Sequence, residues 1–127
     1  MRIVPVLVLA LAVAGCATMN PQSPGMEMAV FDDLPAAPGM TYESGYGHRT
    51  PSGDIRTYTQ VYTGSRRTED VRRFYEEALP VHNWKQMSAE GTTSATLVFE
   101  KRAERCTITI EPSGSILKIK VLVGGRN

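Results

Sequence analysis

The second half of the chain alternates apolar and polar residues, and this pattern constrains the fold more than any other feature. Apolar side chains occupy every second position in three successive segments: Leu97 and Phe99; Cys106, Ile108 and Ile110; Leu117, Ile119, Val121 and Val123. A period of two is the side-chain repeat of a β-strand, and one apolar face per strand is typical of an antiparallel sheet covered on one side. The sequence therefore predicts an antiparallel meander of strands at Trp84 to Ser88, Ser94 to Lys101, Glu104 to Glu111 and Ser115 to Val123.

One helix is predicted ahead of the meander. It opens at Thr68, whose hydroxyl can cap it, with two acids in the first turn, and Pro80 ends it. Its apolar residues recur at helical spacing: Val71, Phe74, Tyr75, Ala78 and Leu79. Packed on the buried side of the sheet, this helix would complete an α+β fold of two layers. Arginines at 66, 67, 72 and 73 alternate with acids, which favours a solvated, self-paired helix face over a phosphate site.

Two further strands, Thr41 to Arg49 and Asp54 to Tyr62, are predicted to form an N-terminal hairpin. A three-residue loop, Pro51 to Gly53, with Gly53 in the left-handed conformation would place residue 50 opposite residue 54. Carried outward, that register sets Tyr46 opposite Tyr58, Tyr42 opposite Tyr62 and His48 opposite Arg56. Four tyrosines would then share one face of the hairpin.

This tyrosine face has two interpretations. Cross-strand aromatic pairs stabilise sheets, so the face can be the core-facing side of the hairpin. Alternatively, it is a flat amphipathic surface that binds a glycan or a peptide, because a tyrosine ring is apolar and its hydroxyl can hydrogen-bond. The candidate binding face then consists of Tyr42, Tyr46, Tyr58, Gln60 and Tyr62.

The N-terminus reads as a secretory signal. Arg2 precedes an apolar run from Ile3 to Val13, which at about 11 residues is far shorter than the roughly 20 of a membrane-spanning helix. Small residues and a cysteine then follow, as Val13-Ala14-Gly15-Cys16. This stretch resembles the lipobox of bacterial lipoproteins, with Val13, Ala14 and Gly15 recognised by the signal peptidase. The alternative is an accidental cysteine after a simple signal peptide.

The resemblance implies that Cys16 becomes the acylated first residue of the mature chain. Two or three acyl chains would hold it stably on a membrane, since a single chain binds only marginally. Ala17 stands where an Asp would favour the inner membrane, so the resemblance implies the periplasmic face of the outer membrane in a diderm host. The predicted organisation is a signal peptide at 1–15, a lipidated cysteine and flexible tether at 16–29, and one globular domain at 30–127.

The mature chain would carry neither a disulfide nor a strong charge. Of the two cysteines, Cys16 is taken by lipid, and the phase of Cys106 places it among buried apolar side chains. An exposed thiol that pairs with another protein is the alternative for Cys106. Losing Arg2 with the signal peptide would leave equal numbers of basic and acidic residues, so we expect no nucleic-acid partner.

The body of the chain resembles a second, uncharacterised group. Five segments carry the likeness in this order: FDDLP, VYTG, FYEEALPVHNW, TLVFEK and CTITI. They are similar to segments of small bacterial lipoproteins built around a domain of unknown function, over about residues 31 to 123. The resemblance implies no activity and no catalytic residues.

No motif in the sequence points to catalysis. His48 and His82 lie at predicted turns, and no spacing of Cys or His is that of a zinc site. We therefore expect a non-enzymatic protein without a metal or cofactor, held at the membrane through Cys16. The predicted function is an interaction or scaffold module for an envelope protein complex. The alternative is a small-ligand or cell-wall glycan binding domain that uses the tyrosine face.

Overall fold

The computed structural model of the chain describes residues 31–126. The predicted lipidation site Cys16, the peptidase-recognition residues Val13, Ala14 and Gly15, and the tether lie outside the described residues. Seven elements follow one another in the order β1 (Thr41–Arg49), β2 (Arg56–Gly64), α1 (Thr68–Val81), β3 (Lys85–Glu90), β4 (Ala95–Lys101), β5 (Glu104–Ser113) and β6 (Ile116–Gly125).

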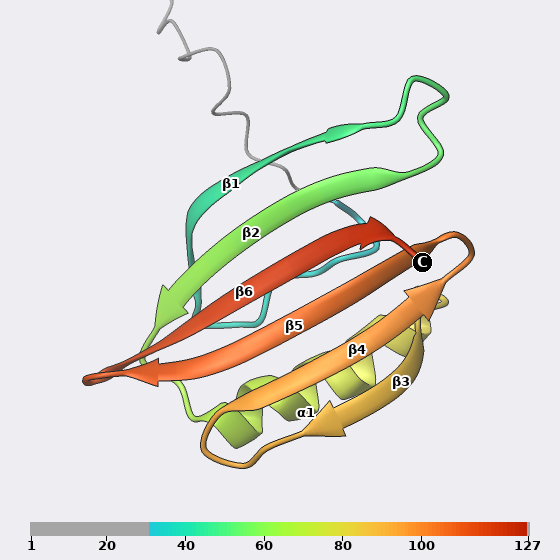
Figure 1. The fold of residues 1–127 in the computed structure, drawn as a ribbon. Coiled ribbons are helices and arrows are strands. Elements are labelled where there is room, and N and C mark those ends of the chain that lie inside the picture. The colour runs from blue at the N-terminus through green and yellow to red at the C-terminus, as the bar shows by residue number, and fades with distance from the viewer. Residues whose placement is uncertain (1–30, 127) are drawn as a thin grey trace, which may run out of the picture.

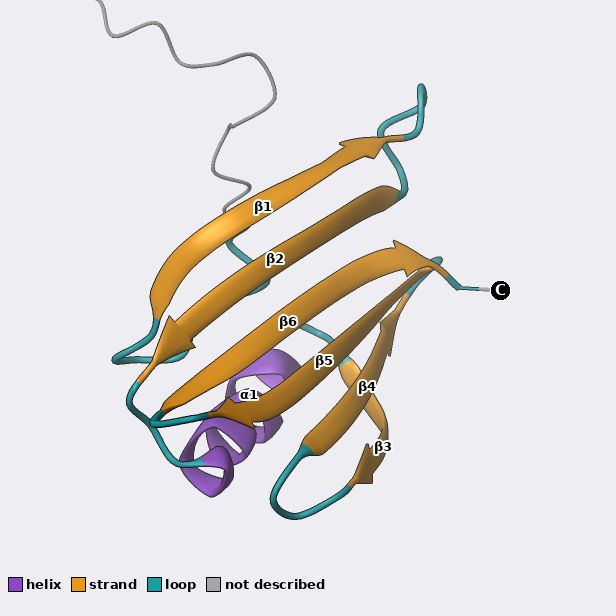
Figure 2. Ribbon diagram, turned by 60° about the vertical axis from the view of Figure 1, so that its left-hand side comes forward, coloured by secondary structure: helices purple, strands orange, loops and turns teal. Residues whose placement is uncertain are grey.

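All six strands form one antiparallel sheet, in the order β1-β2-β6-β5-β4-β3 (Figure 1). The last strand, β6, pairs with β2, so it joins the N-terminal hairpin to the C-terminal meander in a single sheet. Helix α1 lies on one side of this sheet, where it contacts β3, β4 and β5 (Figure 2). The predicted α+β fold of two layers is confirmed.

The core lies between the sheet and its cover, where the alternation along β4, β5 and β6 places it. Leu97, Phe99, Ile108 and Ile119 are fully buried, and so is Cys106, as predicted. The helix contributes Val71, Tyr75 and Leu79 to this core from one stripe. Burying apolar area at about 25 cal/mol per Å² is the main source of stability for such a layer.

An irregular segment covers the half of the sheet that the helix leaves open. Residues 31–40, which we call the strap, run behind β2 and β6 in Figure 1 and bury Leu34 and Ala37 in the core. Phe31 packs edge-on against Tyr58 with ring centroids 4.9 Å apart. The strap has the turn-rich, apolar composition that keeps a segment irregular, with three prolines or glycines among its ten residues.

The hairpin of β1 and β2 differs from its predicted register. Four residues, Pro51 to Asp54, form the loop, because Thr50 N donates to Ile55 O over 2.9 Å and closes the hairpin there. Gly53 takes the predicted left-handed conformation. The extra loop residue shifts the pairing by one, and a β-bulge between Tyr42 and Ser44 restores it, so Tyr42 pairs with Tyr62 as predicted.

Helix α1 differs from expectation at both ends. Its N-cap is Arg67, and the Thr68 hydroxyl donates to Thr93 O over 2.8 Å instead of capping the helix. Pro80 does not end the helix but lies in its last turn, and Val81 is the final residue. Within the part of the chain that the structure describes, no helix has the length and apolarity needed to cross a membrane.

Candidate functional site beneath the strap

Strand β2 presents a row of polar and aromatic side chains to the covered side of the sheet. The row consists of Arg56, Tyr58, Gln60 and Tyr62, at every second position along the strand. The strap lies over this row, with Phe31 on Tyr58 at one end and Met40 beside Gly64 at the other. Gln60 is only 2% exposed, which is rare for an amide side chain.

The first end of the row is a charged cluster of Asp33, Arg56, Lys101 and Glu104. Arg56 Nη1 and Nη2 donate to the two carboxylate oxygens of Asp33 over 2.7 and 2.8 Å. Arg56 Nε and Nη2 also donate to the Glu104 carboxylate over 2.9 and 2.8 Å, and its backbone N–H donates to the same group over 2.8 Å. Lys101 Nζ donates to Asp33 Oδ2 over 2.9 Å. The strap, β2, β4 and β5 therefore meet at this cluster.

Burial and pairing act against each other in this cluster. The side chain of Arg56 is 7% exposed, and burial alone would lower its pKa. Hydrogen bonds from Arg56 to Asp33 and Glu104 outweigh that effect and raise the pKa of the guanidinium. Burial likewise favours neutral carboxyls at Asp33 and Glu104, but the bonds from Arg56 hold the pKa of each below its usual value. All three groups are thus charged at neutral pH.

Aromatic rings enclose the cluster. The Arg56 guanidinium lies 4.8 Å from the Phe31 ring centroid and 6.0 Å from that of Trp84. Lys101 Nζ lies 5.4 Å from the Trp84 centroid. Trp84 Nε1 donates to the backbone oxygen of Asp33 over 2.9 Å, so the indole also holds the strap.

The other end of the row is a group of buried tyrosines. Tyr42 and Tyr62 pack edge-on with centroids 5.5 Å apart. Within residues 31–126, the buried hydroxyls of Tyr42 and Tyr75 have no hydrogen-bond partner of good geometry. The backbone of Ala37 lies near the Tyr75 hydroxyl. Burial raises the pKa of Tyr75, and it raises the pKa of the Cys106 thiol to about 12. The Tyr75 hydroxyl and the Cys106 thiol are therefore protonated at neutral pH.

The predicted tyrosine face forms only in part: Tyr46 leaves it, whereas Tyr42 and Tyr62 face the core, as the first interpretation expected. The shifted register pairs Tyr46 with Thr59 and Gly47 with Tyr58, and it pairs His48 with Thr57. A shift of one residue moves a side chain to the opposite face of the sheet, so Tyr46 points to the uncovered side and is 66% exposed. Tyr42, Tyr58, Gln60 and Tyr62 remain on the covered side.

Glycines in β1 make room for these rings. At Gly45 an added methyl group would overlap the Tyr42 hydroxyl, and at Gly47 it would lie 2.6 Å from Tyr58 Cα. The covered face of β1 is thus bare where β2 carries its aromatic side chains. The platform expected from the sequence is replaced by an enclosed strip beneath the strap.

The charged cluster could not be found from the sequence. Asp33 and Glu104 are separated from Arg56 by 23 and 48 positions. They reach the same guanidinium only because the strap folds back across the sheet. The sequence held one signal: the two-residue period of β2 places Arg56 on the same side of the sheet as Tyr58, Gln60 and Tyr62.

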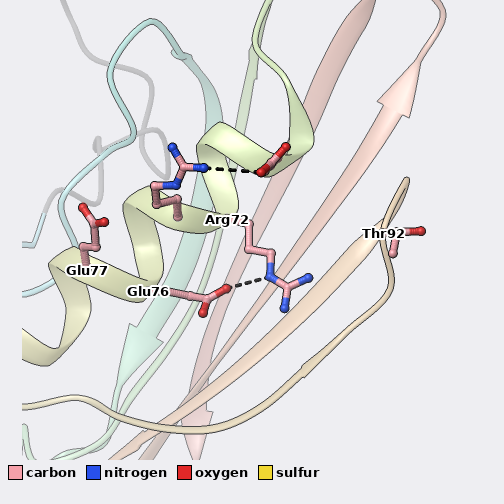
Figure 3. Close-up of a pocket in the computed structure, with 6 residues that line it drawn as sticks. Arg72, Glu76, Glu77 and Thr92 are labelled. Atoms are coloured by element: carbon pink, nitrogen blue, oxygen red, sulfur yellow. Dashed lines mark hydrogen bonds and ion pairs between the residues drawn. The ribbon is translucent and has the colours of Figure 1, made fainter.

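A pocket on the outer surface of α1 is a poor site by comparison. Figure 3 shows Arg72 joined to Glu76 along the helix, with Thr92 opposite on the β3–β4 connection. Arg72 Nε donates to Glu76 over 2.6 Å, and Arg73 donates to Glu69 over 3.3 Å. The prediction of a self-paired helix face is confirmed.

The uncovered side of the sheet carries one row without charges. The strand registers align Tyr46, Thr59, Leu122, Thr107, Val98 and Ser88 across all six strands. Leu122 at the centre of the row is 45% exposed. Charged residues flank it, including Lys120 and the ion pair of Arg105 with Glu100 at 2.8 Å. Of the six residues, Tyr46 and Leu122 are exposed, Ser88, Val98 and Thr107 are partly exposed, and Thr59 is buried.

The fold and the enclosed strip define a small α+β domain with a curved sheet covered by one helix and a strap. A family model described as START domain-like matches residues 45–118, from β1 into β6, which is more than half of the chain. The chain belongs to this START domain-like family. It has no match among the curated proteins or the solved structures with which it was compared.

Proposed function

We propose that this chain is a non-enzymatic binding domain for a small amphipathic ligand that lies between the sheet and the strap. We further propose that acylation of Cys16 holds the domain at the cell envelope, on the periplasmic face of the outer membrane in a diderm host. The domain family supports the first part, because START domain-like folds are often ligand-binding scaffolds.

The observation that carries the proposal is the pair of enclosed hydroxyls of Tyr42 and Tyr75. A buried donor without a partner destabilises a fold by about 1 to 3 kcal/mol, so such groups are uncommon without a role. The Tyr75 hydroxyl lies near the strap at Ala37, and the Tyr42 hydroxyl lies over Gly45 of β1. A ligand with an apolar body and one or two polar atoms would satisfy them.

Ligand binding requires movement of the strap. Leu34 and Ala37 fill the space above the sheet, so they must leave for a ligand to enter. The strap is held by the contacts of Phe31 and Asp33 at one end and has no strand pairing of its own. Segments of this kind open more easily than strands or helices.

The chemistry of the enclosed groups supports binding rather than catalysis. Burial keeps the Cys106 thiol protonated, and a thiol is a weak nucleophile compared with a thiolate. Among residues 31–126, no group of three or more His, Cys, Asp or Glu side chains is placed to hold a metal ion.

Native mass spectrometry of the full chain with Cys16→Ser tests the proposal, because that variant carries no acyl chains of its own. We expect the chain purified from cells to retain one small molecule, and the double variant Tyr42→Phe, Tyr75→Phe to retain much less. Tyr46→Phe is the matched control, since Tyr46 points to the other side of the sheet. Absence of any bound molecule, or equal retention in all variants, would contradict the proposal.

A second candidate function rests on the uncharged row of the open face. Such a surface can dock an envelope protein, as proposed from the sequence, because its centre has no charge to desolvate. Crosslinking in native membranes should capture one protein through this face. Leu122→Glu should abolish the capture and Ile116→Glu, an exposed residue of the same strand outside the row, should not. Equal capture by both variants would exclude this face.

A further inference from the structure

We propose that Arg56 and Lys101 form a binding site for the carboxylate head group of a long-chain amphiphile, and that the Asp33 carboxylate occupies this site when the strap is closed. The inference rests on the proposed ligand-binding function and names the class of ligand. An incoming carboxylate would take the place of Asp33, and the strap would be released.

The geometry at Asp33 is that of a bound carboxylate. Arg56 donates to both carboxylate oxygens through its two terminal nitrogens. Lys101 donates a third hydrogen bond, at 2.9 Å, to one of these oxygens. A planar guanidinium recognises a carboxylate in this two-point fashion wherever it comes from. The carboxylate of a separate molecule would fit the same donors.

Arg56 does not depend on the strap for its orientation. Glu104, on β5, accepts bonds from Arg56 Nε, Nη2 and the backbone N–H. Both ends of this pair belong to the central part of the sheet, next to β6. The guanidinium therefore stays in place when Asp33 leaves, and the site remains assembled for an incoming anion.

The charge balance of the surrounding cleft favours an anion. The cleft has a volume of about 440 Å³, and it is lined by four cations, Arg49, Arg56, Lys101 and Arg102, against three acids, Asp33, Asp54 and Glu104. Within residues 31–126, neither Arg49 nor Arg102 forms an ion pair with an acid. Removal of Asp33 would leave two cations in excess, and one carboxylate head group would restore the charge balance that Asp33 gives.

The cleft and the enclosed strip meet at Arg56, which lines the cleft and begins the row of side chains along β2. Arg56 to Tyr62 on β2 spans about 20 Å at 3.3 to 3.4 Å per residue, and the strap covers this length. The Cys106 thiol interacts electrostatically with Arg56, Asp33 and Glu104, and the Tyr75 hydroxyl interacts in the same way with Cys106. A head group at Arg56 would therefore direct an apolar tail toward the tyrosine hydroxyls.

Trp84 reports on the strap directly, because it is the only tryptophan and its indole N–H bonds to the backbone of Asp33. The full chain with Cys16→Ser is titrated with dodecanoate and, separately, with dodecanol below the concentrations at which either aggregates. We expect dodecanoate to shift Trp84 emission to longer wavelength and to bind at least about tenfold more tightly than dodecanol. Equal affinity for the two would overturn the head-group site.

Two variants sharpen the test. Asp33→Asn removes the competing charge, so dodecanoate should bind several-fold more tightly, whereas Asp32→Asn changes an exposed neighbour and should leave the affinity unchanged. Lys101→Met should weaken dodecanoate binding and leave dodecanol binding as it was, and Lys85→Met, on the exposed face of β3, is its control. An Asp33→Asn affinity equal to that of the parent chain would overturn displacement of Asp33.

The outcomes separate this inference from the proposed function. If dodecanoate and dodecanol bind equally well, the enclosed strip binds amphiphiles and only the head-group site is wrong. If neither binds to the parent chain or to Asp33→Asn, both the head-group site and ligand binding by single-chain amphiphiles fail. If Asp33→Asn does not fold, the comparison of Lys101→Met with Lys85→Met decides the matter.

Discussion

At the scale of single residues, Arg56 shows how one buried charge organises several segments. Its bonds to Asp33 and Glu104 connect the strap to β2 and β5. A buried ion pair adds little net stability over an apolar replacement, but loss of one partner leaves a charge buried without compensation. The cluster therefore determines where the strap lies more than how stable the sheet is.

The low pKa of Asp33 predicts a pH dependence of stability. In the unfolded chain Asp33 would titrate near its usual value of 3.8, whereas in the fold the bonds from Arg56 and Lys101 lower the pKa. The stabilisation is therefore present above about pH 4 and is lost as the pH falls toward the folded pKa. We expect Asp33→Asn to lower the free energy of unfolding by about 3 kcal/mol at pH 7 and by much less near pH 2.

Urea unfolding of the parent chain, Asp33→Asn and Asp32→Asn across this pH range measures the effect. Asp32→Asn should track the parent chain, because Asp32 is exposed and outside the cluster. A difference between the parent and Asp33→Asn that stays constant down to pH 2 would show that Asp33 is not held as an anion in the fold.

The hydroxyl of Tyr75 predicts an unusual response to deletion. Tyr75 is 2% exposed, and its hydroxyl is buried without a well-oriented partner among residues 31–126. Tyr75→Phe removes that burial penalty and keeps the ring, so we expect stability to stay the same or to rise by about 1 kcal/mol. Thermal unfolding compared with Tyr46→Phe would measure this, and a loss of more than about 1 kcal/mol would indicate a hydrogen bond to the Tyr75 hydroxyl.

At the scale of elements, helix α1 and the strap divide the covered side of the sheet between them. The helix contributes the stripe of Val71, Tyr75 and Leu79, and it contacts β3, β4 and β5. The strap contributes Leu34 and Ala37 to the same core and lies over β2. The helix is held by packing along its length, whereas the strap depends on contacts at a few side chains.

Helix packing predicts a clear difference between two aliphatic residues. Leu79 is fully buried, so Leu79→Ala should lower the free energy of unfolding by about 3 kcal/mol through lost burial and the cavity that remains. Val81, two residues on, is exposed, and Val81→Ala should change stability by less than about 0.5 kcal/mol. Chemical denaturation of the two variants checks this, and equal effects would mean that the helix stripe is misplaced.

At the scale of the whole molecule, the domain has one covered and one open side. Ligand binding is proposed beneath the strap and protein docking on the open face, so the two functions would use opposite sides of one sheet. Tyr46 lies on the open face only because of the hairpin register. The strap also continues directly from the segment that would tether the domain to the membrane.

Membrane attachment predicts a specific effect of one substitution. Cys16→Ser removes the thiol that the lipobox resemblance designates for acylation. The variant should therefore lack a lipid label, keep its signal segment and show a higher apparent mass than the mature protein. Metabolic labelling with a fatty-acid analogue and immunoblotting of membrane fractions measure both. Normal processing and labelling of Cys16→Ser would contradict the anchor.

The sequence by itself determined the strands of the meander, the helix stripe, the burial of Cys106 and the two-layer fold, because these depend on local periodicity. The tertiary structure decided the hairpin register, since one additional loop residue and a bulge send Tyr46 to the opposite face. It also decided the path of the strap and the formation of the charged cluster of Asp33, Arg56, Lys101 and Glu104. Those contacts join residues far apart in the chain, and charge pairing at long range leaves no periodic signal.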